Sequence, residues 1–347
     1  MIHILEYIWL DAEGNCRSKT KVVNLSSRLS NVDELPEWNY DGSSTGQAET
    51  GSSEVILRPV KYVNDPFRIT NEAYLVLCET FNTNKTPLPS NTRNDAVKIF
   101  EMKSEHKDPM FGLEQEFFIS RKTVNQLVPV SFPDNQAVPS PQGDFYCGVG
   151  GSNVYCRDLI EQILQRLLHA EIPITGLNAE VAPAQWEFQV CATGIEAADS
   201  LILLRYICNR VLEKQHLYMD IGAKPLQGDW NGSGCHINYS TDLMRNEGGF
   251  KHIEKAIVNL SKNHELHIRH YGDDNNMRLT GKHETSSMSD FSFSVAGRHT
   301  SIRIPSSTKA SRCGYFEDRR PSSSLDPYKC TALLHATSVG LEQDIWK

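Results

Sequence analysis

The apolar segment "FGLEQEFF" at 111–118 carries two glutamates, and this pair most constrains how the chain can fold. Its aromatic and aliphatic residues favour a β-strand, in which every second side chain points to the same side. Glu114 and Glu116 then share one face, while Leu113, Gln115 and Phe117 take the other. Two adjacent negative charges are costly unless a cation lies between them, one is protonated or the face is open to water. The segment alone leaves these three alternatives open.

Composition describes an ordinary globular protein of 347 residues, long enough for a small domain and a large one. The net charge of -8 and the lack of Lys/Arg-rich stretches argue against nucleic acid as a partner. No apolar run is long enough to predict a membrane span. The nine cysteines form no C-x-x-C pair and the first residues do not resemble a secretory signal. We therefore expect a cytoplasmic protein with reduced cysteines and no membrane partner.

The pattern of secondary structure changes near residue 85. Before it, four segments rich in β-branched and aromatic residues predict strands: "EYIWL", "KTKVVNL", "EVILRPVKYV" and "AYLVLCETF". After it, apolar residues recur at helical spacing, which predicts a helix at 93–105 and longer helices at 154–171, 194–217 and 248–272. We therefore predict two domains, residues 1–85 and 86–347.

Three further segments place a carboxylate or an imidazole among apolar and small residues. They are "NAEVAPAQWEFQ" with Glu180 and Glu187, "DWNGSGCHIN" with His236, and "YFEDRRPSSS" with Glu317. Pro183 interrupts the first of these, so we predict a hairpin that brings Glu180 and Glu187 to one side of a sheet. Taken singly, each residue fits a hydrogen-bonded or solvated side chain as well as a metal ligand. Together, carboxylates with at most one imidazole suit Mg²⁺ or Mn²⁺ better than zinc.

Four arginines in the last third of the chain complement these acids: Arg278, Arg298, Arg303 and Arg319. Guanidinium groups hold carboxylates and phosphates through two parallel hydrogen bonds, although most arginines in proteins form surface salt bridges instead. The chain has no G-x-x-x-x-G-K-[ST] loop and no G-x-G-x-x-G segment. An enzyme that handles phosphate without these loops needs side chains and metal ions, which favours a phosphate site here.

Seven motifs, in this order and spacing, resemble the signatures of eukaryotic-type glutamine synthetase. They are "EWNYDGSST", "FGLEQEF", "PQGDFYCGVG", "NAEVAPAQWEFQ", "GDWNGSGCHIN", "MRLTGKHETSSMSDFS" and "SIRIP…GYFEDRRPSSSLDP". The resemblance implies an α+β fold, with a small N-terminal β-grasp domain at 1–85 and a catalytic domain at 86–347. The catalytic domain would contain a curved antiparallel sheet flanked by helices.

The resemblance also implies the reaction. The γ-carboxylate of L-glutamate attacks the γ-phosphate of ATP, and ammonia then displaces phosphate from γ-glutamyl phosphate to give L-glutamine. Two or three Mg²⁺ or Mn²⁺ ions would serve each site. By their motif positions, Glu114, Glu180 and Glu187 would hold one ion on the substrate side. Glu116, His236 and Glu317 would hold the ion that bridges the phosphates, on the nucleotide side.

Other roles follow from the resemblance alone. Glutamate would be bound by Trp230, Asn231, Gly232, Arg278 and Arg319, and the nucleotide by Glu187, Asn238, Ser240, Arg298, Arg303 and Tyr315. Arg298 would also stabilise charge on the transferred phosphoryl group, and Glu284 would close over the intermediate. Asp41 of a neighbouring subunit would help to deprotonate ammonium. Such sites lie between subunits, and the family usually forms two stacked pentamers.

Two other readings remain at this stage. A non-catalytic relative with the same fold would be expected to have lost metal ligands, whereas all six candidates are present. A guanidino kinase of related fold would keep the metal-binding face but would not need Asp41 and Glu284. A glycosidase with two catalytic carboxylates has no use for the arginine cluster.

Overall fold

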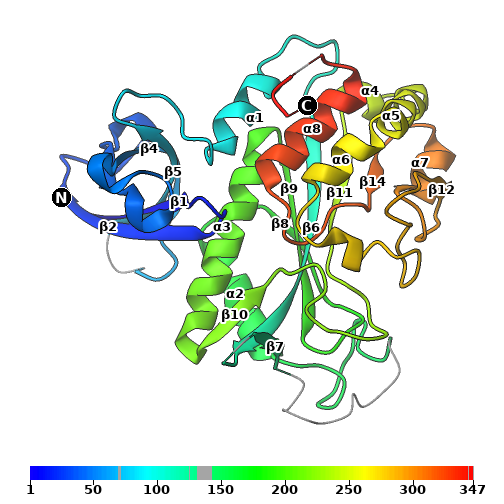
Figure 1. The fold of residues 1–347 in the computed structure, drawn as a ribbon, viewed down its shortest axis with the longest axis horizontal. Coiled ribbons are helices and arrows are strands. Elements are labelled where there is room, and N and C mark those ends of the chain that lie inside the picture. The colour runs from blue at the N-terminus through cyan, green and yellow to red at the C-terminus, as the bar shows by residue number, and fades with distance from the viewer. Residues whose placement is uncertain (69–71, 125, 131–142, 343, 347) are drawn as a thin grey trace.

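The computed structural model describes residues 1–68, 72–124, 126–130, 143–342 and 344–346. Pro141 and Gln142, which begin one of the seven motifs, lie outside these ranges. The chain forms two β-sheets, with nearly all of its helices packed on the second (Figure 1). The predicted α+β class is therefore confirmed.

The first sheet has five strands in the order β2-β1-β5-β4-β3. Their bounds are β1 Ile2–Leu10, β2 Cys16–Asn24, β3 Trp38–Asp41, β4 Glu54–Asn64 and β5 Glu72–Asn82. The central strands β1 and β5 run parallel, and the other pairs are antiparallel. Among the described residues before Thr92 there is no α-helix, as the sequence predicts. The edge strand β3 ends at Asp41, whose side chain caps the short 3₁₀ turn Gly42–Thr45.

The second sheet has nine strands, with the main order β12-β13-β14-β11-β6-β9-β8. Their bounds are β6 Met110–Lys122, β7 Leu127–Pro129, β8 Ile174–Ala179, β9 Gln185–Thr193, β10 Leu217–Asp220, β11 Cys235–Ser240, β12 Phe293–Val295, β13 Ile302–Ile304 and β14 Phe316–Asp318. All described pairs are antiparallel except β12 with β13. The long strand β6 also pairs with β7 and β10 beyond the ends of its main neighbours. It is thus the strand around which this sheet is organised.

Eight α-helices belong to the described part of the chain. Their bounds are α1 Thr92–Phe100, α2 Arg157–His169, α3 Ile195–Leu212, α4 Asp242–Arg245, α5 Phe250–Lys262, α6 His264–His270, α7 Ser306–Ser311 and α8 Pro327–Val339. The helices predicted near 93–105, 154–171 and 194–217 are present with shorter bounds. The single helix predicted at 248–272 is wrong in one respect, because Asn263 leaves helical geometry with φ -113° and ψ 20° and divides it into α5 and α6.

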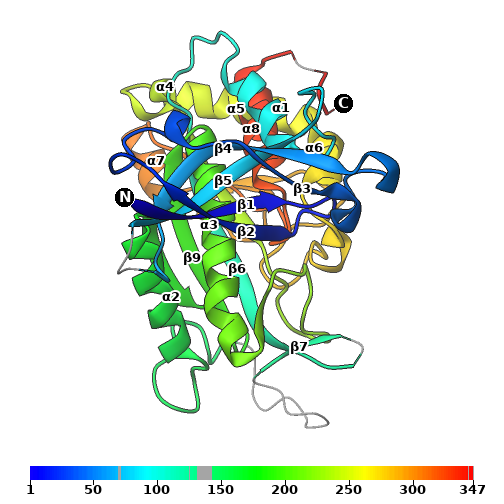
Figure 2. The same cartoon turned by 90° about the vertical axis from the view of Figure 1, so that its left-hand side faces the viewer.

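The alternation expected for the paired-glutamate segment is present in β6. Leu113 and Phe117 are fully buried in the main core, where they pack among apolar residues of α2 and α3. These two helices lie in front of β6 and β9 in Figure 2. Glu114 and Glu116 therefore point away from the helices, toward the other face of the sheet.

An ionic cluster joins the first sheet to helix α3. Glu6 on β1 accepts hydrogen bonds from Arg68, Tyr206 and Arg210, and the last two lie on α3. Burial opposes ionisation of Glu6, but these partners outweigh it and lower its pKa. The two sheets are thereby held together through a buried carboxylate and its partners.

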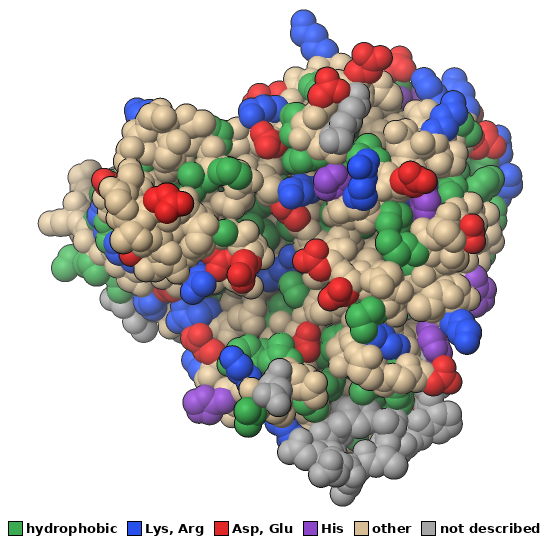
Figure 3. Space-filling view, viewed as in Figure 1, with side chains coloured by type: hydrophobic (Ala, Val, Ile, Leu, Met, Phe, Trp, Pro, Cys, Tyr) green, Lys and Arg blue, Asp and Glu red, His purple; other side chains and the backbone are tan. Residues whose placement is uncertain are grey.

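Figure 3 shows acidic and basic side chains interspersed over one face of the molecule, with hydrophobic side chains in small groups between them. A search of the described residues found no helix with the length and apolar character that a bilayer crossing needs.

Candidate functional site

The six predicted metal ligands come together in one cavity of about 410 Å³ on the face of the second sheet opposite α2 and α3. Four adjacent strands supply five of them, and the sixth directly follows a fifth strand. Glu114 and Glu116 lie on β6, Glu187 on β9, His236 on β11 and Glu317 on β14, while Glu180 follows the last residue of β8. Residues as far apart in the chain as Glu114 and Glu317 therefore meet at one point.

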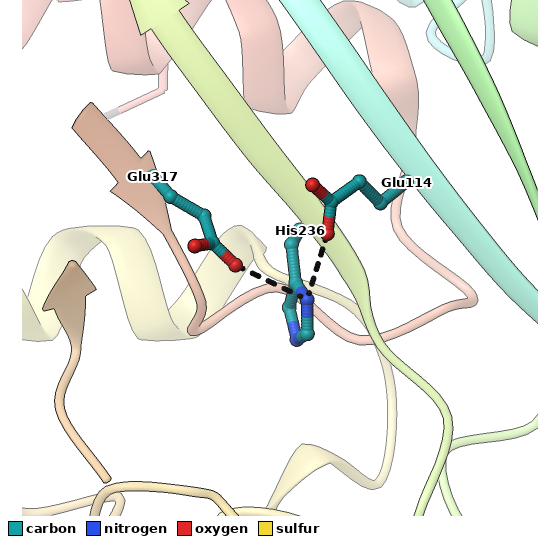
Figure 4. Close-up of side chains that lie close together, drawn as sticks. All are labelled: Glu114, His236 and Glu317. Carbon is teal, nitrogen blue, oxygen red and sulfur yellow. Dashed lines mark hydrogen bonds and ion pairs between the residues drawn. The ribbon is translucent and has the colours of Figure 1, made fainter. Parts of the chain in front are cut away.

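The six side chains form two groups whose ligand atoms lie within 4.8 Å of one another. The carboxylate triad consists of Glu116, Glu180 and Glu187, and the imidazole triad of Glu114, His236 and Glu317. Figure 4 shows the three side chains of the imidazole triad pointing toward one another from β6, β11 and β14. His236 Nδ1 lies 3.3 Å from Glu114 Oε2 and 3.5 Å from Glu317 Oε1.

This grouping corrects the assignment made from the motifs, which exchanged Glu114 and Glu116 between the two sites. The reason is strand register. Glu114 lies directly opposite His236 on β11, whereas Glu116 lies directly opposite Glu187 on β9. Directly paired residues have neighbouring Cβ atoms, so each glutamate joins the triad of its cross-strand partner.

The predicted hairpin around Pro183 is present as β8 and β9, which pair antiparallel. The Glu180 N–H donates to the Gln185 carbonyl at 2.9 Å and closes the turn. Ala184 adopts a positive φ of 60°, which is uncommon for a residue with a side chain. The turn brings Glu180 back toward Glu187, so both carboxylates face the cavity.

Burial and mutual repulsion raise the pKa of every member of the carboxylate triad to about 8. Burial is the larger cause in each case. The next cause is a neighbouring carboxylate: Glu180 acts on Glu116, Glu187 acts on Glu180, and Glu114 acts on Glu187. Three carboxylates held this close favour either a shared proton or a bound cation.

Each of four glutamates accepts a hydrogen bond from a side-chain amide. The donors and acceptors are Asn178 to Glu180 at 2.8 Å, Gln189 to Glu187 at 2.7 Å, Gln185 to Glu116 at 3.2 Å and Asn238 to Glu114 at 2.7 Å. A neutral amide fixes the direction of a carboxylate without cancelling its charge. The sequence analysis missed Asn178, Gln185 and Gln189 in this role. Their signal was the position of each amide two residues from a glutamate in "NAEVAPAQWEFQ".

Arginines surround the imidazole triad instead. Arg303 donates to one oxygen of Glu317 at 2.7 Å, and Arg319 donates to the other at 2.5 Å. Arg278 Nη2 lies 2.9 Å from His236 Nε2, which accepts its hydrogen bond. Burial, followed by the charges of Arg319 and Arg278, lowers the pKa of His236 well below its usual value. The imidazole is therefore neutral, and it would bind a metal beside Glu114 and Glu317 through an unprotonated Nδ1.

The loop with Glu284 forms part of the cavity wall and is tied to the same arginines. Arg319 Nη2 donates to the Glu284 carbonyl at 3.3 Å, and Thr285 Oγ1 donates to the Arg278 carbonyl at 3.2 Å. His283 and Glu284 both have positive φ, 51° and 60°. Two consecutive residues with side chains in this region are strained, and such strain gathers at functional loops.

Some of the other residues predicted for the site line the cavity, and some do not. Arg298, Asn231 and Gly232 line the cavity. A Cβ on Gly232 would lie 2.5 Å from the Ala223 carbonyl oxygen and 2.9 Å from Arg278 Cγ, so this position requires glycine. Trp230 is buried in a small apolar cluster with Phe145.

Besides Trp230 and Asn238, three more predicted residues do not line the cavity. Ser240 is buried at the end of β11, and Tyr315 is exposed beside β14. Asp41 lies on the first sheet, fully exposed, where hydrogen bonds from Ser43 and then Ser44 lower its pKa to about 2. Within one chain Asp41 therefore does not reach the ligands. Conversely, the cavity wall includes Tyr146, which the sequence analysis did not single out.

The donor set fits two hard divalent cations. Five carboxylates and one neutral imidazole are what Mg²⁺ or Mn²⁺ prefers over zinc, and cations would relieve the repulsion that raises the three pKa values. Arginines at the rim of the same cavity provide sites for carboxylates or phosphates. The arrangement can thus hold an anionic substrate, metal ions and a polyphosphate together.

Comparison with known proteins agrees with this chemistry. The family described as "Glutamine synthetase, catalytic domain" matches residues 90–265. The glutamine synthetase of Kluyveromyces lactis is 49% identical over 97% of this chain and 89% of its own length. That of Saccharomyces cerevisiae is 48% identical over 97% and 89%. The glutamine synthetase cytosolic isozyme of Pinus sylvestris is 46% identical over 99% and 94%.

Proposed function

The chain belongs to the eukaryotic-type glutamine synthetase family and is a glutamate–ammonia ligase, and from this premise we propose how its residues carry out the reaction. The overall change is the joining of ammonia to L-glutamate with cleavage of ATP to ADP and phosphate, in which the phosphate carries away one oxygen of the γ-carboxylate. The observation that carries the proposal is the meeting of two ligand triads and an arginine-lined wall in one cavity.

The two triads hold two divalent cations, Mg²⁺ or Mn²⁺, in our proposal. When bound, these cations would neutralise charge on the phosphates and on the glutamate γ-carboxylate, the main requirement of phosphoryl transfer. Asn238 donates to Glu114 beside the imidazole triad, and Arg303 lies there too. These predicted nucleotide contacts favour the imidazole triad as the nucleotide side, and the carboxylate triad as the glutamate side.

Arg278 and Arg319 bind the carboxylates of glutamate in this proposal, with Asn231, Gly232 and the neighbouring Trp230. Both arginines are buried at the cavity wall. Their guanidinium groups are held in place by backbone carbonyls, the Arg319 and Arg320 carbonyls for Arg278 and the Arg298 carbonyl for Arg319. Fixed donors of this kind orient the γ-carboxylate for attack on phosphorus.

Arg298 and Arg303 stabilise the charge that develops on the transferred phosphoryl group, and Asn238, Ser240 and Tyr315 complete the nucleotide side. Glu187, which the motifs also assign to the nucleotide, belongs to the carboxylate triad. Glu284 closes the site when both substrates are bound, which keeps water from γ-glutamyl phosphate. The contacts of its loop with Arg319 and Arg278 couple this closure to the residues that bind glutamate.

Asp41 of one subunit assists deprotonation of ammonium in the site of its neighbour. Its exposed position at the edge of the first sheet supports this arrangement. We propose that the chain forms a homo-oligomer of two stacked pentamers, with a domain boundary near residue 85, and that it acts in the cytoplasm.

Phosphate release from ATP tests the proposal. Purified protein with Mg²⁺ should release phosphate only when L-glutamate and ammonium are both present. Glu317→Ala should abolish release, and Glu161→Gln, at an exposed position of α2, should leave it unchanged. Release that needs neither substrate, or that survives Glu317→Ala, would contradict the assignment.

A further inference from the structure

Gln115 lies between the two paired glutamates, but its side chain is on the opposite face of β6. It is fully buried and belongs to neither triad. Its Nε2 donates to the Glu116 carbonyl at 2.8 Å and to the Ser323 Oγ at 2.7 Å. Ser323 Oγ in turn donates to the Glu116 carbonyl. The backbone of Glu116 is thus fixed from behind by two side chains.

Arg205 on α3 holds this pair in place. Its Nε donates to Gln115 Oε1 at 2.8 Å, Nη2 donates to the Ser323 carbonyl at 2.9 Å, and Nη1 donates to the Leu325 carbonyl at 3.0 Å. All three partners are neutral oxygens. Among the described residues no carboxylate lies within salt-bridge distance of this buried guanidinium.

A buried arginine without a carboxylate is costly, so the contacts it makes need a reason. For comparison, Arg93 on α1 is also largely buried, but it is paired through two hydrogen bonds with Asp199 at 2.8 and 2.9 Å. Arg93 joins α1 to α3 and does not touch the strands that carry the ligands. Arg205 instead joins β6 to the segment 321–325, which directly follows β14 and Arg319.

Arg205, Gln115 and Ser323, which we call the Arg205 clamp, act on ligands of both triads. The Arg205 clamp fixes Glu116 of the carboxylate triad through its backbone. Ser323 also donates its N–H to the Ser233 carbonyl at 3.0 Å, and the neighbouring Gly234 N–H donates to Glu116 Oε2 at 2.8 Å. The same segment continues from the strand that carries Glu317. One guanidinium group therefore sets the position of strands from which both triads are built.

We propose that Arg205, through Gln115 and Ser323, is a positioning residue for the two metal sites, acting from the opposite side of the sheet. This inference rests on the metal-binding role of Glu116 proposed above. Because Arg205 does not touch the cavity, its effect on metal binding passes only through backbone position. Partners of this outer kind commonly contribute 10- to 100-fold to metal affinity.

The test compares Arg205→Lys with Arg93→Lys in the full-length oligomer. Lysine keeps the charge but cannot form the three directed hydrogen bonds. Both variants should lower the melting temperature without metal. Only Arg205→Lys should weaken Mn²⁺ binding, by about tenfold or more as measured by electron paramagnetic resonance of free Mn²⁺. Equal Mn²⁺ affinity in the two variants would overturn the proposal.

Gln115→Glu decides the question if Arg205→Lys does not assemble. It gives Arg205 an ion pair, but an ionised carboxylate cannot donate to the Glu116 carbonyl. Weakened Mn²⁺ binding in this variant supports the positioning role, and unchanged binding refutes it. Wild-type protein that binds no Mn²⁺ would instead refute the metal role of Glu116, and the inference with it.

Discussion

The carboxylate triad and the imidazole triad lie side by side on the same sheet and share strand β6, but they are surrounded differently. Neutral amides orient Glu116, Glu180 and Glu187, whereas arginines contact two of the three ligands of the imidazole triad, His236 and Glu317. Once its protons are lost, the carboxylate triad offers three negative charges to a cation. The imidazole triad has one carboxylate fewer, and the negative charge of Glu317 is partly balanced by its arginine neighbours.

One cavity therefore contains two candidate cation sites with different electrostatic surroundings. We expect the carboxylate triad to bind a divalent cation without help. The imidazole triad should bind its cation well only when phosphate oxygens draw Arg303 away and add negative charge of their own.

Glu180→Gln should nearly abolish activity. Removal of a ligand should cost more in Mn²⁺ affinity than the roughly 100-fold upper value typical of outer partners. Equilibrium dialysis without nucleotide measures the affinity, and phosphate release measures the activity. Glu161→Gln is the control, since it removes an exposed carboxylate from α2. Normal Mn²⁺ binding in Glu180→Gln would show that this triad is not the stronger site.

Asn178→Ala should weaken Mn²⁺ binding at the same site by roughly 10- to 100-fold, because a hydrogen bond to a charged group contributes roughly 1.5–3 kcal/mol. The ligands all remain, so excess Mn²⁺ should restore most of the activity. Isothermal titration gives the affinity. Activity that stays low at saturating Mn²⁺ would assign Asn178 a role other than orienting Glu180.

Arg303→Gln should strengthen Mn²⁺ binding at the imidazole triad rather than weaken it. Loss of the contact at 2.7 Å frees one oxygen of Glu317, so Mn²⁺ affinity without nucleotide should rise by a few-fold. The KM for ATP should rise as well, because a phosphate contact is lost. Mn²⁺ titrations with and without ADP separate the two effects. Weaker Mn²⁺ binding without nucleotide would contradict the proposed balance of charge.

The stability of the metal-free protein should fall as pH rises through the range between the ordinary and the raised pKa values. Glu116, Glu180 and Glu187 have pKa values of about 8, above the ordinary 4.5. Within that window the folded state holds protons that the unfolded chain has lost, so deprotonation favours unfolding. Saturating Mg²⁺ should therefore raise the melting temperature more at about pH 8.5 than at about pH 6. An equal rise at both values would argue against carboxylates with raised pKa.

The sequence predicts much of this site because strand alternation is local. Period two in β6 places Glu114 and Glu116 on one face, and Pro183 predicts the hairpin that carries Glu180 and Glu187. The predominance of carboxylates among the candidate ligands then indicates hard divalent cations. The motifs add the family, which the comparisons confirm.

What the sequence could not supply is pairing between distant segments. Register decides that Glu114 lies opposite His236 and Glu116 opposite Glu187, and no local pattern encodes it. The amide partners and the Arg205 clamp depend on the same long-range contacts. The break at Asn263 was missed because apolar spacing continues across it from α5 to α6.

The most direct test of the two-triad account is a Mn²⁺ titration of Glu114→Gln and Glu116→Gln beside the wild type. The account predicts two Mn²⁺ per chain in the presence of ADP and phosphate. Glu116→Gln should lose the ion that binds without nucleotide, and Glu114→Gln should lose the ion that needs nucleotide. The reverse pattern, or loss of the same ion in both variants, would contradict the grouping of the six ligands.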